Sequence, residues 1–289
     1  IEVYIQMQLV ELAEQHWQNG KYDSAKLIYD YSLNFLPDHE VSVFNTLFRL
    51  AKFKTDFLTA ESSRQEILDA VHAHRAEMMR FFDFFPDSVS RLAAMAYARM
   101  SSVYFRHFPS ILGYGEYDQA AYDYALSFAN SAIAIQDSSI NRIRRGRIAA
   151  WQLDTASVSF RNAEGLPMNG LIDVVNISGS EAWPLSPFPS DNRSFLVEGG
   201  AIQFNLFKGH SYDMTARISV NGGPSINYYV PDIPHARGLR ITFAHGQPML
   251  IENLGGPNAP CEIVFISGQP ASPYNLSAVK NSDKFTLSW

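Results

Sequence analysis

The sequence has one cysteine, no long apolar run and no excess of basic residues. The single cysteine, Cys261, cannot form an intrachain disulfide, so a secreted disulfide scaffold is excluded, while the cellular compartment stays open. No apolar run approaches the roughly 20 residues that a membrane-spanning helix needs, and we predict no membrane span. The first residue is Ile1 rather than Met, which suggests a processed chain or a piece of a longer polypeptide.

The shortage of positive charge holds in both halves of the chain. Positions 1–150 contain 15 basic and 18 acidic residues, and positions 151–289 contain 8 and 11. Because binding to a phosphate backbone needs a basic excess, we predict no nucleic-acid partner. Hydrophobic residues make up 46% of the 289 positions and charged residues 18%, a globular composition over a length that suits two domains.

The first half has the apolar spacing of helices. Leu9, Leu12 and Trp17 recur at helical intervals before Asn19 and Gly20, which end that segment. Further on, Ser63 with Glu66 has the spacing of a capping box, which predicts a helix starting there. Similar patterns predict seven helices in all, up to about position 152. The last of them carries an arginine cluster, which is typical of a helix C-terminus and is also suited to an acidic partner.

An internal repeat gives this helical half its character. The segment that starts at Tyr22 has the pattern Tyr-x-x-Ala-x-x-x-Tyr-x-x-Ser-Leu. A similar pattern, Tyr-x-x-Ala-x-x-x-Ala-x-x-Ala-Ile, starts at Tyr122. The two copies are 100 residues apart, close to three repeat units of about 34 residues. Together with Trp17, Gly20 and Pro37, the first copy resembles the tetratricopeptide repeat (TPR). The resemblance implies antiparallel helix pairs that approach closely where the repeat has small residues, and a surface that docks a protein partner. The alternative is a general helical bundle with small residues at its crossings.

After Asp154 the apolar rhythm changes to alternation, as at Val158 and Phe160. About ten short candidate strands follow, separated by glycine-rich turns and without a helix between them. This pattern favours a sandwich or barrel over a parallel βαβ fold. We therefore predict an α plus all-β protein of two domains, with a TPR-like antiparallel helical array at 1–152 and an antiparallel β-sandwich at 153–289.

Within the β half, the spacing of Gly209 and Tyr212 before a long alternating strand is similar to the central hairpin of jelly-roll carbohydrate-binding modules. The resemblance implies a jelly-roll-like sandwich and assigns no ligand residues. Sugars stack on aromatic rings and bond to amides and carboxylates. The residues of these types near loops and strand ends are Trp183, Asn227, Tyr228, Tyr229 and Asp232. Their alternative role is packing, since Tyr228 and Tyr229 are adjacent and point to opposite faces of a strand.

A metal-dependent enzyme is the second hypothesis. Helical repeats followed by a β-barrel are similar to aspartyl/asparaginyl hydroxylases, which would imply an Fe(II)/2-oxoglutarate-type oxygenase. The candidate ligands are His210, Asp213, His235 and His245, with Arg237 or Arg240 for a cosubstrate carboxylate. Their spacing does not match the usual His-x-Asp, and histidines in loops are usually solvated.

We therefore predict a non-catalytic recognition protein without a cofactor. Its helical repeats would dock a protein partner, and its β-sandwich would bind a glycan or another surface, as part of a larger polypeptide or assembly. The alternatives are the oxygenase and a structural component of a surface layer or virion.

Overall fold

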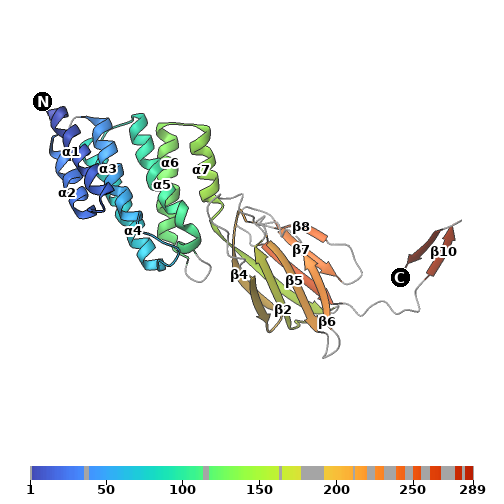
Figure 1. The fold of residues 1–289 in the computed structure, drawn as a ribbon. Coiled ribbons are helices and arrows are strands. Elements are labelled where there is room, and N and C mark those ends of the chain that lie inside the picture. The colour runs from blue at the N-terminus through green and yellow to red at the C-terminus, as the bar shows by residue number, and fades with distance from the viewer. Residues whose placement is uncertain are drawn as a thin grey trace. The chain divides into compact units, whose positions relative to one another are not determined.

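The fold is described from a computed structural model of the chain (Figure 1). The structure describes residues 2–35, 39–112, 117–162, 165–176, 192–210, 212–219, 225–230, 239–244, 250–254, 261–267, 277–281 and 284–288. The chain divides into two compact units, Ile1–Trp151 and Gln152–Trp289. None of the described helices combines the length and the apolarity that crossing a membrane requires.

The N-terminal unit consists of helices that follow one another as hairpins. The described helices are α1 (Glu2–Gln18), α2 (Tyr22–Ser32), the short 3-10 helix η1 (Leu33–Phe35), α3 (Glu40–Thr55), α4 (Arg64–Phe84), α5 (Arg91–Ile111), α6 (Gln119–Ile135) and α7 (Ser139–Ala149). Each helix packs against the next, and α3 and α7 also contact α5 (Figure 1). The prediction of a helical N-terminal half is confirmed.

The helix boundaries follow from local chemistry. Ser63 accepts a hydrogen bond from the Glu66 main chain while the Glu66 side chain accepts one from the Ser63 main chain, the predicted capping box. Gly20 has a φ of 71°, which a glycine adopts at low cost and which allows the turn between α1 and α2. The last helix is capped by Ser138, whose side chain accepts a hydrogen bond from the Asn141 main chain.

The repeated small residues lie where helices meet. Ala25 and Ser32 on α2 are fully buried, and so are Ala125 and Ala132 on α6. Small side chains at these positions let the helix axes approach closely. Around α2 the core contains larger side chains from several helices, among them Tyr29, Leu47 and Phe81.

The described strands of the C-terminal unit form three sheets. A five-stranded sheet has the order β4 (Ala201–Phe207), β1 (Leu153–Asn162), β9 (Cys261–Ser267), β7 (Leu239–Ala244) and β8 (Leu250–Asn253). A four-stranded sheet has the order β3 (Asn192–Val197), β2 (Gly170–Asn176), β5 (Tyr212–Ser219) and β6 (Ser225–Val230). The strands β10 (Ser277–Asn281) and β11 (Lys284–Ser288) form a hairpin.

Alternate residues of the two larger sheets are buried, as the two-residue period predicts. Val158 and Phe160 on β1 are buried with Phe265 on β9, and Met214 and Ile218 are buried on β5. Several contacts join these sheets, including a hydrogen bond from Arg193 Nη1 of β3 to the main-chain oxygen of Asn205 on β4 at 3.4 Å. The Phe195 ring of β3 stacks on the Phe204 ring of β4 with centroids 4.7 Å apart, and the main-chain N–H of Phe207 donates to Tyr212 Oη at 3.0 Å.

The prediction of a purely antiparallel β half is wrong for the five-stranded sheet. Strand β9 pairs in parallel with both β1 and β7, whereas every pairing in the four-stranded sheet is antiparallel. Alternation reveals that a segment is a strand but not the direction of its neighbour. The segment between β7 and β9, which includes β8, is long enough for the crossover that parallel pairing needs. These parallel pairs do not support jelly-roll connectivity.

Candidate functional site

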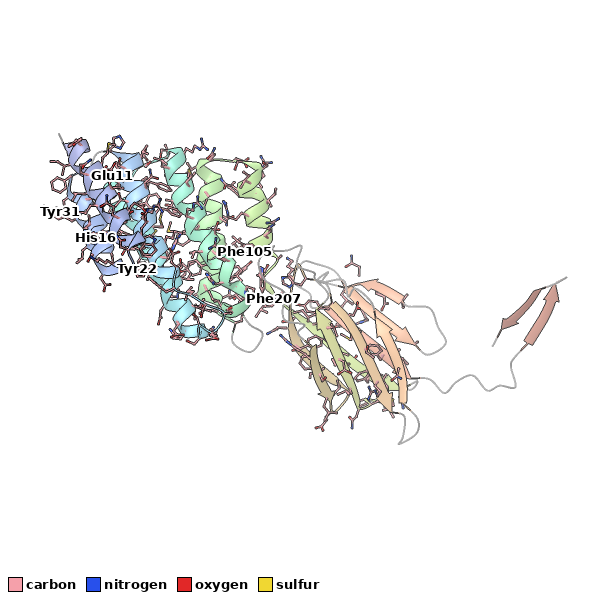
Figure 2. The ribbon with its side chains drawn as sticks, in the orientation of Figure 1. Glu11, His16, Tyr22, Tyr31, Phe105 and Phe207 are labelled. Atoms are coloured by element: carbon pink, nitrogen blue, oxygen red, sulfur yellow. The ribbon has the colours of Figure 1, made fainter. Side chains whose placement is uncertain are left out.

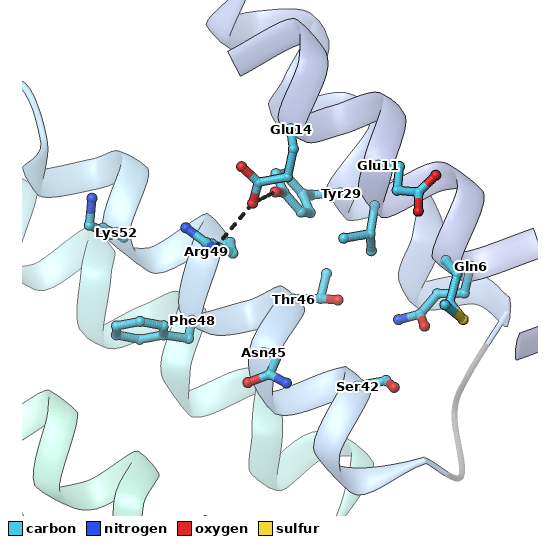
Figure 3. Close-up of a pocket in the computed structure, with 12 residues that line it drawn as sticks. Gln6, Glu11, Glu14, Tyr29, Ser42, Asn45, Thr46, Phe48, Arg49 and Lys52 are labelled. Carbon is cyan, nitrogen blue, oxygen red and sulfur yellow. Dashed lines mark hydrogen bonds and ion pairs between the residues drawn. The ribbon is translucent and has the colours of Figure 1, made fainter. Parts of the chain in front are cut away.

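A groove opens between α1 and α3, with the end of α2 at its floor (Figure 3). It encloses about 640 Å³ and is lined by Gln6, Met7, Val10, Glu11, Glu14, Tyr29, Ser42, Asn45, Thr46, Phe48, Arg49 and Lys52. The lining residues recur three and four positions apart on α1 and on α3, so each helix presents one stripe to the groove. The groove is therefore a direct product of two amphipathic helices packed in sequence.

Glu14 is the centre of the polar contacts in this groove. The Tyr29 hydroxyl donates to Glu14 Oε1 at 2.5 Å, and Arg49 Nη2 lies 3.3 Å from the same oxygen (Figure 3). Burial raises the pKa of Tyr29 well above its usual range, and the hydrogen bond to Glu14 adds to the effect. Tyr29 is thus a fixed donor, and it holds the carboxylate between itself and the guanidinium.

Several groove side chains keep unused hydrogen-bonding capacity. Gln6 is only 5% exposed, and within the described residues its amide makes no hydrogen bond. The amide of Asn45, which is exposed on α3, also has no partner in the described part of the chain. The Gln6 amide is not among the described side-chain groups that are both buried and without a partner, so it still reaches the open groove, where a bound polar ligand can replace water as its partner. An amide can both donate to and accept from a peptide group.

A smaller hollow continues from the groove along α3. The two hollows share Glu14, Tyr29, Arg49 and Lys52, and Trp17, Phe53 and Asp56 complete the second. Lys52 Nζ is 2.8 Å from Asp56 Oδ2, and the Trp17 and Phe53 rings stack with centroids 4.1 Å apart. The groove thus changes from amide and apolar groups at one end to paired charges and rings at the other.

Sequence reasoning did not identify this groove. Glu14, Asn45 and Arg49 are ordinary helix-surface residues in the sequence, and only the packing of α1 against α3 brings them together. The available signal was the repeat itself, because a repeated helical hairpin places the first helix of each pair on a common side.

Of the residues suggested for sugar binding, Asn227 is exposed on β6, the edge strand of its sheet. Tyr228 pairs with Ala216 and Tyr229 with Thr215 in the register of β6 and β5. Trp183 and Asp232 lie outside the described residues. The structure therefore places one member of the set on the surface.

Of the residues suggested for iron, His210 and Asp213 are described, whereas His235 and His245 lie outside the described residues. His210 is 2% exposed, with its ring centroid 5.2 Å from that of Phe207. The expectation that this histidine is solvated is wrong, because the turn after β4 folds it into the core. In the part of the chain that the structure describes, no three His, Cys, Asp or Glu side chains gather in a way that would hold a metal.

The arginine cluster of α7 is partly engaged within the unit. Arg142 bonds to Asp137 through two nitrogens at 2.6 and 2.8 Å, and Arg144 donates to Asn141 at 2.8 Å. Burial lowers the pKa of Arg144, and the charge of Arg99 adds to this. The charge of the cluster therefore acts beyond its own helix, because Arg144 and Arg99 of α5 interact electrostatically.

Comparison with known proteins gives no family. No protein-family description matches the chain, and no curated protein matches it. The N-terminal domain of stress-induced protein-1 (STI-1) from C. elegans is similar in structure over 51% of this chain and 97% of that chain, at 9% sequence identity and a TM-score of 0.34. A likeness at that score assigns neither fold nor function.

Proposed function

We propose that the N-terminal unit is a TPR-like scaffold that binds an extended segment of a protein partner in the groove between α1 and α3. The observation that carries the proposal is an open groove whose nearly buried amide, Gln6, has no hydrogen-bond partner among the described residues. An extended peptide exposes main-chain N–H and C=O groups at regular intervals, and these match the amides of Gln6 and Asn45. The buried small residues at both copies of the repeat support the TPR-like assignment.

A groove-filling substitution tests this proposal. Peptides would be selected on the purified full chain from a phage-displayed random library, and their affinities measured by fluorescence anisotropy. We expect Asn45→Trp to weaken the selected peptides about tenfold or more, because a large ring would occupy the space that the peptide needs.

The matched control is Lys26→Trp, which adds the same ring to an exposed position on α2 outside the groove lining. It should leave the affinities unchanged. Selected peptides that bind Asn45→Trp as tightly as the unchanged chain would contradict a groove-bound partner.

We propose that the C-terminal unit is a β-sandwich that recognises a glycan or another surface. We also propose that the two units are separate domains, with their boundary in the sequence near position 152. The stacked Phe195 and Phe204 rings between the sheets and the exposed amide position of Asn227 support this role. We expect Asn227→Ala and Trp183→Ala to reduce binding on a glycan array, and Gln203→Ala, exposed on β4, to have no effect. An array on which the unchanged chain binds no glycan would exclude the sugar.

A further inference from the structure

Charge is distributed unevenly over the first helix of each successive pair. Helix α1 has three glutamates and no lysine or arginine, and α3 has three basic residues and one acidic. Helix α5 has three arginines, α7 has four, and neither has an aspartate or glutamate. The charge therefore rises steadily from negative at α1 to strongly positive at α7, although the whole chain has a net charge of −6.

The arginines of α5 lie on its one exposed stripe. Arg91, Arg99 and Arg106 are exposed; Arg99 and Arg106, seven residues apart, lie nearly in line along the helix, whereas Arg91, eight residues before Arg99, is offset by about 80°. The half-buried residues between them, Met95 and Ser102, complete the stripe. Most other positions of α5 are buried against its neighbours, so this stripe is the main surface that α5 offers to a ligand.

The stripe is continuous with the groove. The Arg99 guanidinium carbon lies 4.7 Å from the centre of the Phe48 ring, and Phe48 lines the groove. Helix α7 packs against α5, and the charge of Arg99 adds to the burial that lowers the pKa of Arg144 on α7. Groove, Arg99 and Arg144 thus form one surface across α1, α3, α5 and α7, which we name the graded face.

The cations on the graded face differ in whether an anion already holds them. Arg49, near α1, is paired with Glu14. Within the described residues, no ion pair engages Arg99 or Arg106. Arg99 and Arg144, which no carboxylate pairs with in the described part of the chain, repel one another, and an anionic ligand removes that repulsion.

We propose that the segment bound on the graded face is acidic at the end that lies over α5 and α7, and neutral or basic at the end that lies by Glu11 and Glu14 of α1. This proposal rests on the groove being the binding site, and it adds the chemistry and the direction of the partner. A protein segment satisfies the grading because its charge can change sign along its length. A nucleic acid has a uniform negative charge, which Glu11 and Glu14 would repel.

Defined peptides test the proposal. One fluorescein-labelled peptide would have glutamates at one end and serine and lysine at the other, and a second would replace each glutamate by glutamine. We expect the glutamate peptide to bind the full chain more tightly, with an affinity that falls as salt is added. Because the double variant removes two exposed charge pairs with the peptide, Arg99→Gln with Arg106→Gln should weaken the glutamate peptide about tenfold.

The matched control is Arg142→Gln, which removes an exposed arginine already held by Asp137. It should leave the affinity within about twofold, and circular dichroism would show that all variants fold. Equal affinity for the two peptides, or no loss in the double variant, would overturn the proposal. The proposal would also be overturned if a single-stranded oligothymidylate bound the full chain more tightly than the glutamate peptide does and lost affinity in the double variant.

The two proposals fail in different ways. If library peptides are selected and Asn45→Trp blocks them, but they are neutral or basic throughout, the groove binds a partner and the acidic assignment is wrong. If Asn45→Trp blocks no selected peptide, the groove itself is not the site.

Discussion

Replacing Phe81 by alanine is expected to lower the free energy of unfolding of the helical unit by about 3–5 kcal/mol. Phe81 lies on α4, is fully buried, and belongs to the core shared by several helices. Its ring meets the Phe44 ring edge-on with centroids 5.9 Å apart and lies 5.3 Å from the Phe82 and Phe85 rings. Removing it leaves a cavity that these rings cannot close, since they are held by their own helices. Urea unfolding followed by circular dichroism at 222 nm measures the change.

The control for this substitution is Met79→Ala on the same helix. Met79 is exposed, so its loss should change the free energy of unfolding by about 0.5 kcal/mol or less. If Phe81→Ala also lowered the free energy of unfolding by only about 0.5 kcal/mol or less, α3 and α4 would not pack through this ring. The groove described between α1 and α3 would then be in doubt.

The sequence predicts helices well wherever a local signal sets their ends. Ser63 and Glu66 define the start of α4 because a capping box involves only four consecutive residues. The buried Ala25 and Ala132 could be recognised because a repeat requires the same contact twice. Strand positions such as Tyr212 at the start of β5 follow from alternation beside a glycine turn.

What the sequence leaves open depends on partners that are distant along the chain. The parallel pairing of β9 with β1 joins residues about a hundred positions apart, and no local pattern encodes its direction. His210 is buried because the turn after β4 folds back on Phe207, a contact that a lone histidine in a glycine turn does not predict. The groove also depends on residues that are distant in the sequence, because Glu14 and Arg49 become neighbours only when α1 packs near α3.

The helical unit should also lose stability as the pH falls from about 6.5 towards 4. His74 on α4 is 6% exposed, and burial lowers its pKa from 6.5 to about 4. The main chain of Ala51 and the carboxylate of Asp56 oppose this shift, whereas Arg106 and Arg99 of α5 add to it. The pKa of His107 is also lowered to about 4, by burial and by Arg106.

The sign follows from proton binding. Below pH 6.5 the unfolded chain takes up a proton at His74 that the folded chain does not, so the unfolded state is favoured. Above pH 6.5 both states are neutral there, and the contribution is constant. For His74 the free energy of unfolding should fall by about 2 kcal/mol between pH 7 and pH 5. His107 acts in the same direction by less, because its side chain is only partly buried.

A variant that cannot take up the proton separates this effect from the titration of carboxylates. His74→Gln keeps a polar side chain of similar length, so its free energy of unfolding should be flatter than that of the unchanged chain between pH 7 and pH 5. The comparison uses the slope against pH rather than the absolute value, since the substitution alters packing at every pH. Urea unfolding at several pH values, followed at 222 nm, measures it. Parallel curves for the two proteins would show that His74 is protonated equally in the folded and unfolded states. The burial of this ring would then not lower its pKa as described.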